Sequence, residues 1–171
     1  KAGIKIGPND WKERIYQSNP ACCEVWFRLD WYKRYSEMFN YLNQEKIPFG
    51  LHFWAVIEKD YFPCLLYTKG KIAEKSYSKI IETIDLASKP NAAYGNFHPE
   101  AYRLVELDLD KKTIKVVDED EPIDREKSFK QFLGYLDKIN KYAKKKNIIP
   151  YVETVPRYMP QQYHDIHTGR L

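Results

Sequence analysis

Short apolar runs alternate with helix-length amphipathic segments along most of the chain. The runs are rich in β-branched and aromatic residues and predict five strands, at 3–7, 23–29, 49–53, 93–97 and 148–152. Between them, apolar residues recur at three- and four-residue steps and predict four helices, at about 11–17, 30–42, 77–84 and 128–146. Such regular alternation indicates an α/β fold with parallel strands and right-handed crossovers.

Capping and burial can be predicted for several of these helices. Asp10 and Asp30 stand where an N-cap is expected before the first and second helices. In the longest helix, five apolar residues are expected to face the core: Phe129, Phe132, Leu133, Leu136 and Ile139. Its last turn, KYAKKK, carries positive charge that suits the negative end of the helix dipole.

The segment after the fourth strand has a different period. Val105 and Leu107 alternate with Glu106 and Asp108, DKKT provides a turn, and Ile114 and Val116 lead back. This pattern predicts a β-hairpin insertion at about 102–118 within a single domain spanning 1–171. The connection after the third strand is unusually long, and such loops are often functional.

Composition narrows the class of protein. A complete eight-stranded (β/α) barrel typically needs about 250 residues, and this chain has 171 with a formal net charge of only +4. That charge is too small to indicate a dedicated nucleic-acid binder. Cys22, Cys23 and Cys64 form no spaced framework, which favours a reduced cytoplasmic protein, and no apolar run is long enough for a membrane span. The motifs of dinucleotide-binding enzymes, P-loop NTPases, α/β-hydrolases and zincins are missing from the sequence.

Three potential metal ligands, His52, His98 and Glu153, each stand at the end of a predicted strand. Because the carboxyl ends of parallel strands meet at one edge of a sheet, we expect these side chains to converge. Imidazole and carboxylate together suit a divalent ion such as Zn, Mn, Mg or Co. A core histidine satisfied by one hydrogen bond is the alternative for His52, whereas a carboxylate placed directly after IIPYV would be costly to bury without a partner.

Further residues are candidates for binding substrate or completing the metal site. Arg157 suits an anionic group such as phosphate, and Trp54 can stack on a sugar, although core packing explains Trp54 equally well. Arg28 is more typical of an ordinary surface ion pair. His164 and His167 have the spacing of two ligands on one helical turn, but exposed tail histidines are the favoured interpretation.

The segments LHFW, GNFHPE and VETVPRY resemble the strand ends of the xylose isomerase-like TIM-barrel superfamily, which includes sugar-phosphate isomerases and epimerases and endonuclease IV. The resemblance implies the first five strands and four helices of a (β/α)8 barrel, and a divalent-metal site at His52, His98 and Glu153. The family's later Asp, His and Glu ligands come from strands six to eight, for which this sequence has no counterpart. The chain by itself is therefore expected to be inactive and to act as part of a longer enzyme.

The function implied by this resemblance is isomerisation or epimerisation of a sugar or sugar phosphate. The metal would polarise the substrate, and Glu153 would be both ligand and catalytic base. An endonuclease IV-like phosphodiesterase acting on DNA is the alternative enzyme. A non-catalytic half-barrel that binds a partner or forms a homodimer is the third hypothesis, because open sheet edges favour association. The sequence names neither the sugar nor the metal.

Overall fold

This computed structural model describes residues 2–57, 61–98, 102–108, 113–117 and 122–153. Internal contacts divide the chain into two compact units. Unit 1 comprises Lys1–Ala55, Ser78–Phe97 and Asp137–Glu153, and unit 2 comprises Val56–Tyr77, His98–Leu136 and Thr154–Leu171. That the whole chain forms a single domain stays a prediction.

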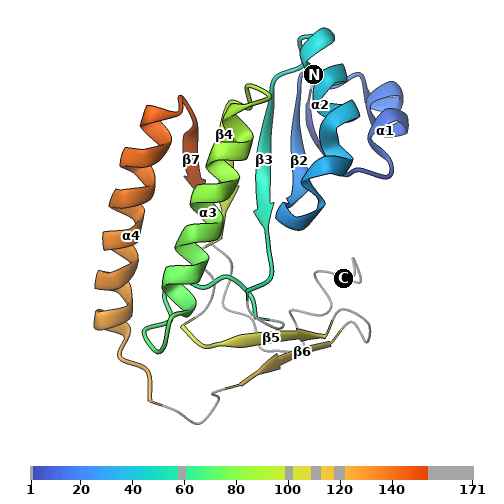
Figure 1. Cartoon of the computed structure of the whole chain (residues 1–171). Coiled ribbons are helices and arrows are strands. Elements are labelled where there is room, and N and C mark those ends of the chain that lie inside the picture. Colours follow the sequence, from blue (N-terminus) through green and yellow to red (C-terminus); the bar gives the residue numbers. More distant parts are fainter. Residues whose placement is uncertain (1, 58–60, 99–101, 109–112, 118–121, 154–171) are drawn as a thin grey trace. The chain divides into compact units, whose positions relative to one another are not determined.

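The elements follow the predicted order (Figure 1). In chain order they are β1 (Gly3–Ile6), α1 (Trp11–Ser18), β2 (Cys22–Arg28), the 3-10 helix η1 (Leu29–Tyr35), α2 (Ser36–Gln44), β3 (Phe49–Trp54), α3 (Ile72–Ser88), β4 (Tyr94–Phe97), β5 (Val105–Asp108), β6 (Thr113–Val116), α4 (Arg125–Lys145) and β7 (Ile149–Val152).

Unit 1 is built on a five-stranded sheet with the order β1-β2-β3-β4-β7. All four strand pairs are parallel. Strand order equals chain order, as it does in consecutive βα units of a barrel. The predicted α/β class and the parallel pairing are therefore confirmed.

Helices cover one face of this sheet, and aromatic rings fill the layer between them (Figure 1). Phe27 of β2 and Phe49 of β3 both pack against Phe39 of α2, with ring centroids 6.4 and 5.5 Å apart. The ring of Tyr35 stacks on Phe39, and its hydroxyl bonds the backbone of β2 at Arg28 N and Trp26 O. Tyr35 can be buried because both hydrogen-bonding functions of its hydroxyl are satisfied.

Each α-helix is closely followed by a residue in the left-handed conformation: Asn19, Lys46, Asn91 and Asn147. Three of the four are Asn, which tolerates positive φ better than most residues. The backbone N–H of Asn19 bonds the carbonyl of Ile15, which closes α1. These residues end the helices, and short connections lead from each helix to the next strand of the sheet.

Two capping predictions are wrong. Asp10 precedes α1 but its side chain makes no cap; it accepts from the backbone of Gly7 and pairs with Arg14. Asp30 pairs with Arg28 instead of capping a helix, and the segment after it is η1, so α2 begins only at Ser36. In both places a nearby guanidinium competes for the carboxylate.

The prediction of which α4 residues face the core is also partly wrong. Phe129 and Leu133 are 51% and 47% exposed, whereas Phe132, Ile139 and Ala143 are buried. The buried stripe continues at Ser128 rather than Phe129. The α4 helix is thus rotated relative to the most apolar stripe of its sequence.

Unit 2 contains the predicted hairpin. β5 and β6 pair antiparallel, and Tyr61 bridges to Glu106. The turn DKKT falls mostly outside the described residues. The long connection after β3 is held by buried polar contacts: Ser76 Oγ accepts from the backbone N–H of Cys64 at 2.7 Å, and Gln131 donates to the carbonyls of Leu65 and Tyr67.

None of the helices in the described part of the chain has the length and apolar character needed to cross a membrane.

Replacing Asp85 by Asn should lower the free energy of unfolding slightly. Asp85 of α3 accepts from Lys146 at 2.7 Å and from the hydroxyl of Tyr142, and these contacts, Lys146 first, lower the pKa of Asp85. A lowered pKa stabilises the fold at pH above the ordinary value of about 3.9, and that contribution is lost as the pH falls below it. Because solvent screens this pair, we expect less than about 1 kcal/mol at pH 7. Urea unfolding at pH 7 and pH 3 measures the difference, with Asp137→Asn as the control for an exposed helical ion pair; a difference that grows at pH 3 would contradict the assignment.

Candidate metal centre

Polar residues gather on the face of the sheet opposite the helices. In β2, Cys23, Val25 and Phe27 are buried against the helices, whereas Trp26 on the other face is 50% exposed. The alternation of strand side chains places Glu24 on the same face as Trp26. The register pairs Lys5 with Glu24 across β1 and β2.

Polar residues also lie on this face of β3 and β4. The register aligns Glu24 with Gly50 and then with Tyr94, and it aligns His52 with Asn96. The cluster therefore draws one or two polar side chains from each of four neighbouring strands.

His52 lies within β3, two residues before the strand ends, inside the strand predicted at 49–53. Its side chain is only 7% exposed. Nδ1 lies 2.9 Å from Oε1 of Glu24 and 3.7 Å from Oε2 of Glu153. Both carboxylates therefore lie near the same ring nitrogen, and Glu24 is the closer of the two.

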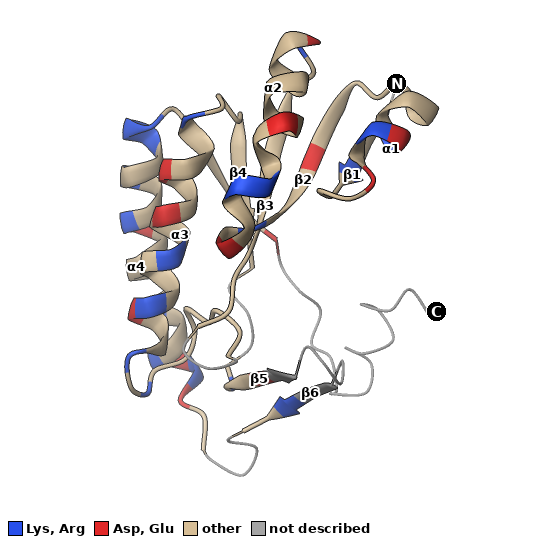
Figure 2. Ribbon diagram, turned by 45° about the vertical axis from the view of Figure 1, so that its right-hand side comes forward, with Lys and Arg blue, Asp and Glu red and all other residues tan. Residues whose placement is uncertain are grey.

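Glu24 is the acidic residue of β2, the red band on that strand in Figure 2. Besides His52, its carboxylate contacts Lys5 at 3.2 Å, Tyr94 Oη at 3.3 Å and Asn96 Nδ2 at 3.3 Å. The hydrogen bond with His52 and the contact with Lys5 outweigh desolvation and lower the pKa of Glu24 to about 2. Burial and the neighbouring Glu24 carboxylate raise the pKa of Tyr94, which stays a neutral donor.

Glu153 directly follows β7, and its backbone N–H continues the parallel ladder by bonding the carbonyl of Phe97 at 3.0 Å. Its side chain is 50% exposed, and Oε2 accepts from Asn96 Nδ2 at 2.8 Å. Asn96 is buried, and its Oδ1 has no hydrogen-bond partner among the described residues. A buried acceptor of this kind calls for a donor or a cation that the described part of the chain does not supply.

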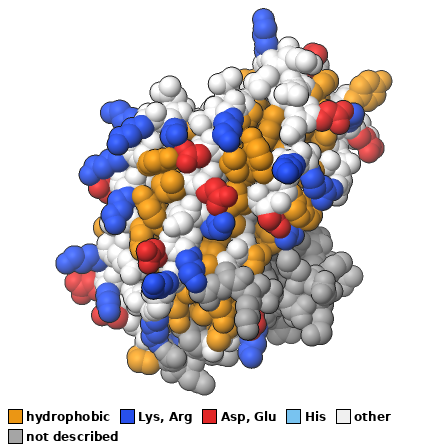
Figure 3. Space-filling view, viewed as in Figure 1, with side chains coloured by type: hydrophobic (Ala, Val, Ile, Leu, Met, Phe, Trp, Pro, Cys, Tyr) orange, Lys and Arg blue, Asp and Glu red, His pale blue; other side chains and the backbone are white. Residues whose placement is uncertain are grey.

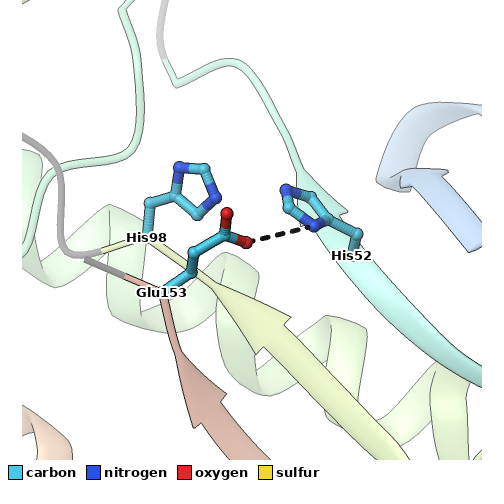
Figure 4. Close-up of side chains that lie close together, drawn as sticks. All are labelled: His52, His98 and Glu153. Carbon is cyan, nitrogen blue, oxygen red and sulfur yellow. Dashed lines mark ion pairs between the residues drawn. The ribbon is translucent and has the colours of Figure 1, made fainter. Parts of the chain in front are cut away.

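His98 is the first residue after β4, and one ligand atom each of His52, His98 and Glu153 lie within 4.8 Å of one another (Figure 4). Donors bound at about 2.1 Å to a tetrahedral ion are about 3.4 Å apart. A pair of ligand atoms at the 4.8 Å limit would therefore need to approach by roughly 1.4 Å to bind one ion. Two imidazoles and a carboxylate are a donor set that zinc and related ions accept, so the residues fit a divalent cation.

Sequence reasoning missed the residues that support these ligands, namely Lys5, Glu24, Tyr94 and Asn96. A signal for Glu24 was present, because it interrupts the apolar run of β2 at a position that alternates with Cys23 and Val25. Its partner could not be identified from the sequence, since the partner depends on strand register.

Two other candidate residues from the sequence, Trp54 and Arg28, contact each other. Trp54, the last residue of β3, packs against Trp26 with ring centroids 6.4 Å apart and lies under the guanidinium of Arg28 at 4.8 Å. Arg28 also stacks on Trp31 at 4.5 Å and pairs with Asp30. Arg157, His164 and His167 lie outside the described residues.

Comparisons with known proteins bear on the fold. No family model matches the chain, and no curated protein matches it. Among solved structures, a D-psicose 3-epimerase determined in the presence of D-fructose superposes with a TM-score of 0.63 at 13% identity, over 92% of this chain and 53% of the epimerase. A Thermus thermophilus protein soaked with ZnCl2 gives 0.61 at 13% identity, over 99% and 64%. Endonuclease IV from the same organism gives 0.53 at 10% identity, over 94% and 54%.

The parallel sheet and the single layer of helices on one of its faces define part of a (β/α) barrel. More particularly, the chain has the fold of the xylose isomerase-like TIM-barrel proteins. It spans about half to two thirds of the length of these neighbours. The predicted resemblance in fold is therefore confirmed.

Proposed function

We propose that the chain forms part of a divalent-metal-dependent isomerase or epimerase acting on a sugar or sugar phosphate. The observation that carries this proposal is the convergence of His52, His98 and Glu153 at the carboxyl end of the sheet, where barrels of this type place their active sites. Several structural neighbours are sugar epimerases by name, among them D-psicose 3-epimerase and 3-keto-D-glucoside 4-epimerase.

The two carboxylates of the cluster differ in what they can do. Glu24 accepts from Lys5, Tyr94 and Asn96, lies beside Nδ1 of His52 and has a pKa of about 2, so it is a weak base at neutral pH. Glu153 is half exposed and accepts a hydrogen bond from the neutral amide of Asn96. We therefore assign the proton transfer to Glu153, which would also be a metal ligand.

A bound divalent ion would polarise a substrate carbonyl or hydroxyl. The exposed ring of Trp26 and the neighbouring Trp54 offer an aromatic surface beside His52, on which the apolar face of a sugar ring can pack. Arg157 is proposed to bind an anionic group of the substrate.

An endonuclease IV-like phosphodiesterase is the second candidate. It is favoured by the histidines at both the third and the fourth strand ends, His52 and His98, and by the likeness in fold to endonuclease IV. Against it, the formal net charge of the chain is only +4, whereas a DNA-binding surface gathers positive charge. On the helix-covered face, which Figure 3 shows, lysines, arginines and carboxylates are interspersed. A homodimer or a non-catalytic binding module is the third candidate. Cys22, Cys23 and Cys64 form no disulfide with one another, and we propose a reducing compartment such as the cytoplasm.

Isotope exchange tests the proposed reaction. Incubated with Mn²⁺ or Zn²⁺ in D₂O, a longer enzyme that contains this chain should catalyse deuterium incorporation into a ketose or ketose phosphate, at the carbon next to the carbonyl, because the proton transferred there exchanges with solvent. NMR of the recovered sugar measures the incorporation, with the EDTA-treated enzyme as control. Nicking of abasic DNA without exchange into sugar would instead establish the phosphodiesterase. Cation binding with neither activity would favour the non-catalytic binding module.

A further inference from the structure

We propose that Glu24 is a positioning residue for the cation site: its carboxylate holds His52 with the proton on Nδ1 and leaves Nε2 free of a proton for the metal. This inference rests on the proposed metal site and goes beyond it, because Glu24 belongs to β2 and is not one of the three converging ligands.

The contact between the two side chains carries the argument. Oε1 of Glu24 lies 2.9 Å from Nδ1 of His52, closer to that nitrogen than either Lys5 or Asn96. A carboxylate oxygen has only lone pairs to offer. If Nδ1 also carried a lone pair, two acceptors would face each other at hydrogen-bond distance. A proton on Nδ1 removes this repulsion and makes a charge-assisted hydrogen bond.

Two other donors approach the same nitrogen and must be weighed. Lys5 Nζ lies 3.1 Å from Nδ1, and Asn96 Nδ2 lies 3.3 Å from it. Both have a carboxylate to donate to instead: Lys5 contacts Glu24 at 3.2 Å, and Asn96 contacts Glu153 at 2.8 Å. Since each donor has an acceptor of full negative charge within reach, neither needs the imidazole lone pair.

The environment of Glu24 requires an acceptor-only group. Besides His52, it faces the ammonium of Lys5, the hydroxyl of Tyr94 and the amide of Asn96. An amide at this position would turn an NH₂ group toward a set of donors. The arrangement matches the general use of a carboxylate to fix the tautomer and ring orientation of a ligating histidine.

Gly50 makes this network sterically feasible. It stands between Glu24 and Tyr94 in the register of β2, β3 and β4. A Cβ at Gly50 would lie 2.2 Å from the Tyr94 ring, so only the missing side chain lets that ring cross β3 and reach Glu24. Three strands thereby contribute to holding one histidine.

The tautomer can be read directly in the metal-free protein. In long-range ¹H–¹⁵N spectra at pH 8 with EDTA, wild-type His52 should show the proton on Nδ1. In Glu24→Gln, we expect the Nε2–H form to gain population, and Zn²⁺ affinity measured by calorimetry should fall by about 10–100-fold. Glu45→Gln, at the exposed end of α2, is the matched control and should change neither quantity.

Each outcome bears on one proposal. A wild-type His52 protonated on Nε2 would overturn the role of Glu24, and this measurement needs no variant to fold. The role of Glu24 would also be overturned if Glu24→Gln left both the tautomer of His52 and the affinity for Zn²⁺ unchanged. If the Nδ1–H form depends on Glu24 but wild type binds no Zn²⁺, the hold on His52 stands and the proposed metal function fails. If wild type and Glu24→Gln bind Zn²⁺ equally, the metal site stands and the positioning role fails.

Discussion

Replacing Glu153 by Gln should weaken Zn²⁺ binding at least about 100-fold, because it removes the anionic ligand of the proposed site; losing even an outer-shell partner typically costs about 10–100-fold. The fold should be nearly unaffected. The Glu153 side chain is half exposed, and the amide oxygen of Gln can still accept the hydrogen bond from Asn96 Nδ2. Calorimetric titration with Zn²⁺ measures the affinity, and urea unfolding checks stability.

Glu45→Gln is again the matched control, since it neutralises an exposed carboxylate at the end of α2. Wild-type affinity in Glu153→Gln would remove Glu153 from the metal site. The same variant should also lose the deuterium exchange proposed above, because the catalytic base is missing. Exchange that returns to the wild-type rate in Glu153→Gln at saturating Zn²⁺ would separate the two roles and leave Glu153 as a ligand only.

Replacing Gly50 by Ala should destabilise the protein by about 1–3 kcal/mol, the usual range for overpacking. The new methyl group would overlap the Tyr94 ring, with ring carbons 2.2–2.4 Å from the ideal Cβ. The ring would have to move, and it would lose its contact with Glu24 and its edge-on packing against Tyr151. Urea unfolding of Gly50→Ala and wild type measures the change.

A double-mutant cycle identifies the cause. In a Tyr94→Ala background the overlap is removed, so Gly50→Ala should cost much less there than in wild type. As a further control, Gly134→Ala adds a methyl group where nothing lies within 4 Å, and Ala favours the α4 helix. Additive effects of Gly50→Ala and Tyr94→Ala would show that the ring is not what Gly50 accommodates.

Local pattern was enough to predict the elements and the class of fold. The period of apolar residues separates strands from helices, and Asn19, Asn91 and Asn147 end helices because Asn tolerates positive φ. Both signals act over a few residues and are readable from the sequence alone. The capping roles of Asp10 and Asp30 were less predictable, because a carboxylate can bind a nearby arginine instead of the helix backbone.

The ligands of the candidate site could be proposed once the strands were predicted, because parallel strands bring their carboxyl ends to one edge of the sheet. The sequence by itself thus determined the α/β order of elements and the nomination of His52, His98 and Glu153. Only the tertiary structure decided which side chains support them. Glu24, Gly50 and Tyr94 are far apart in the chain, and their meeting depends on a register in which a shift of one residue would turn each side chain to the opposite face.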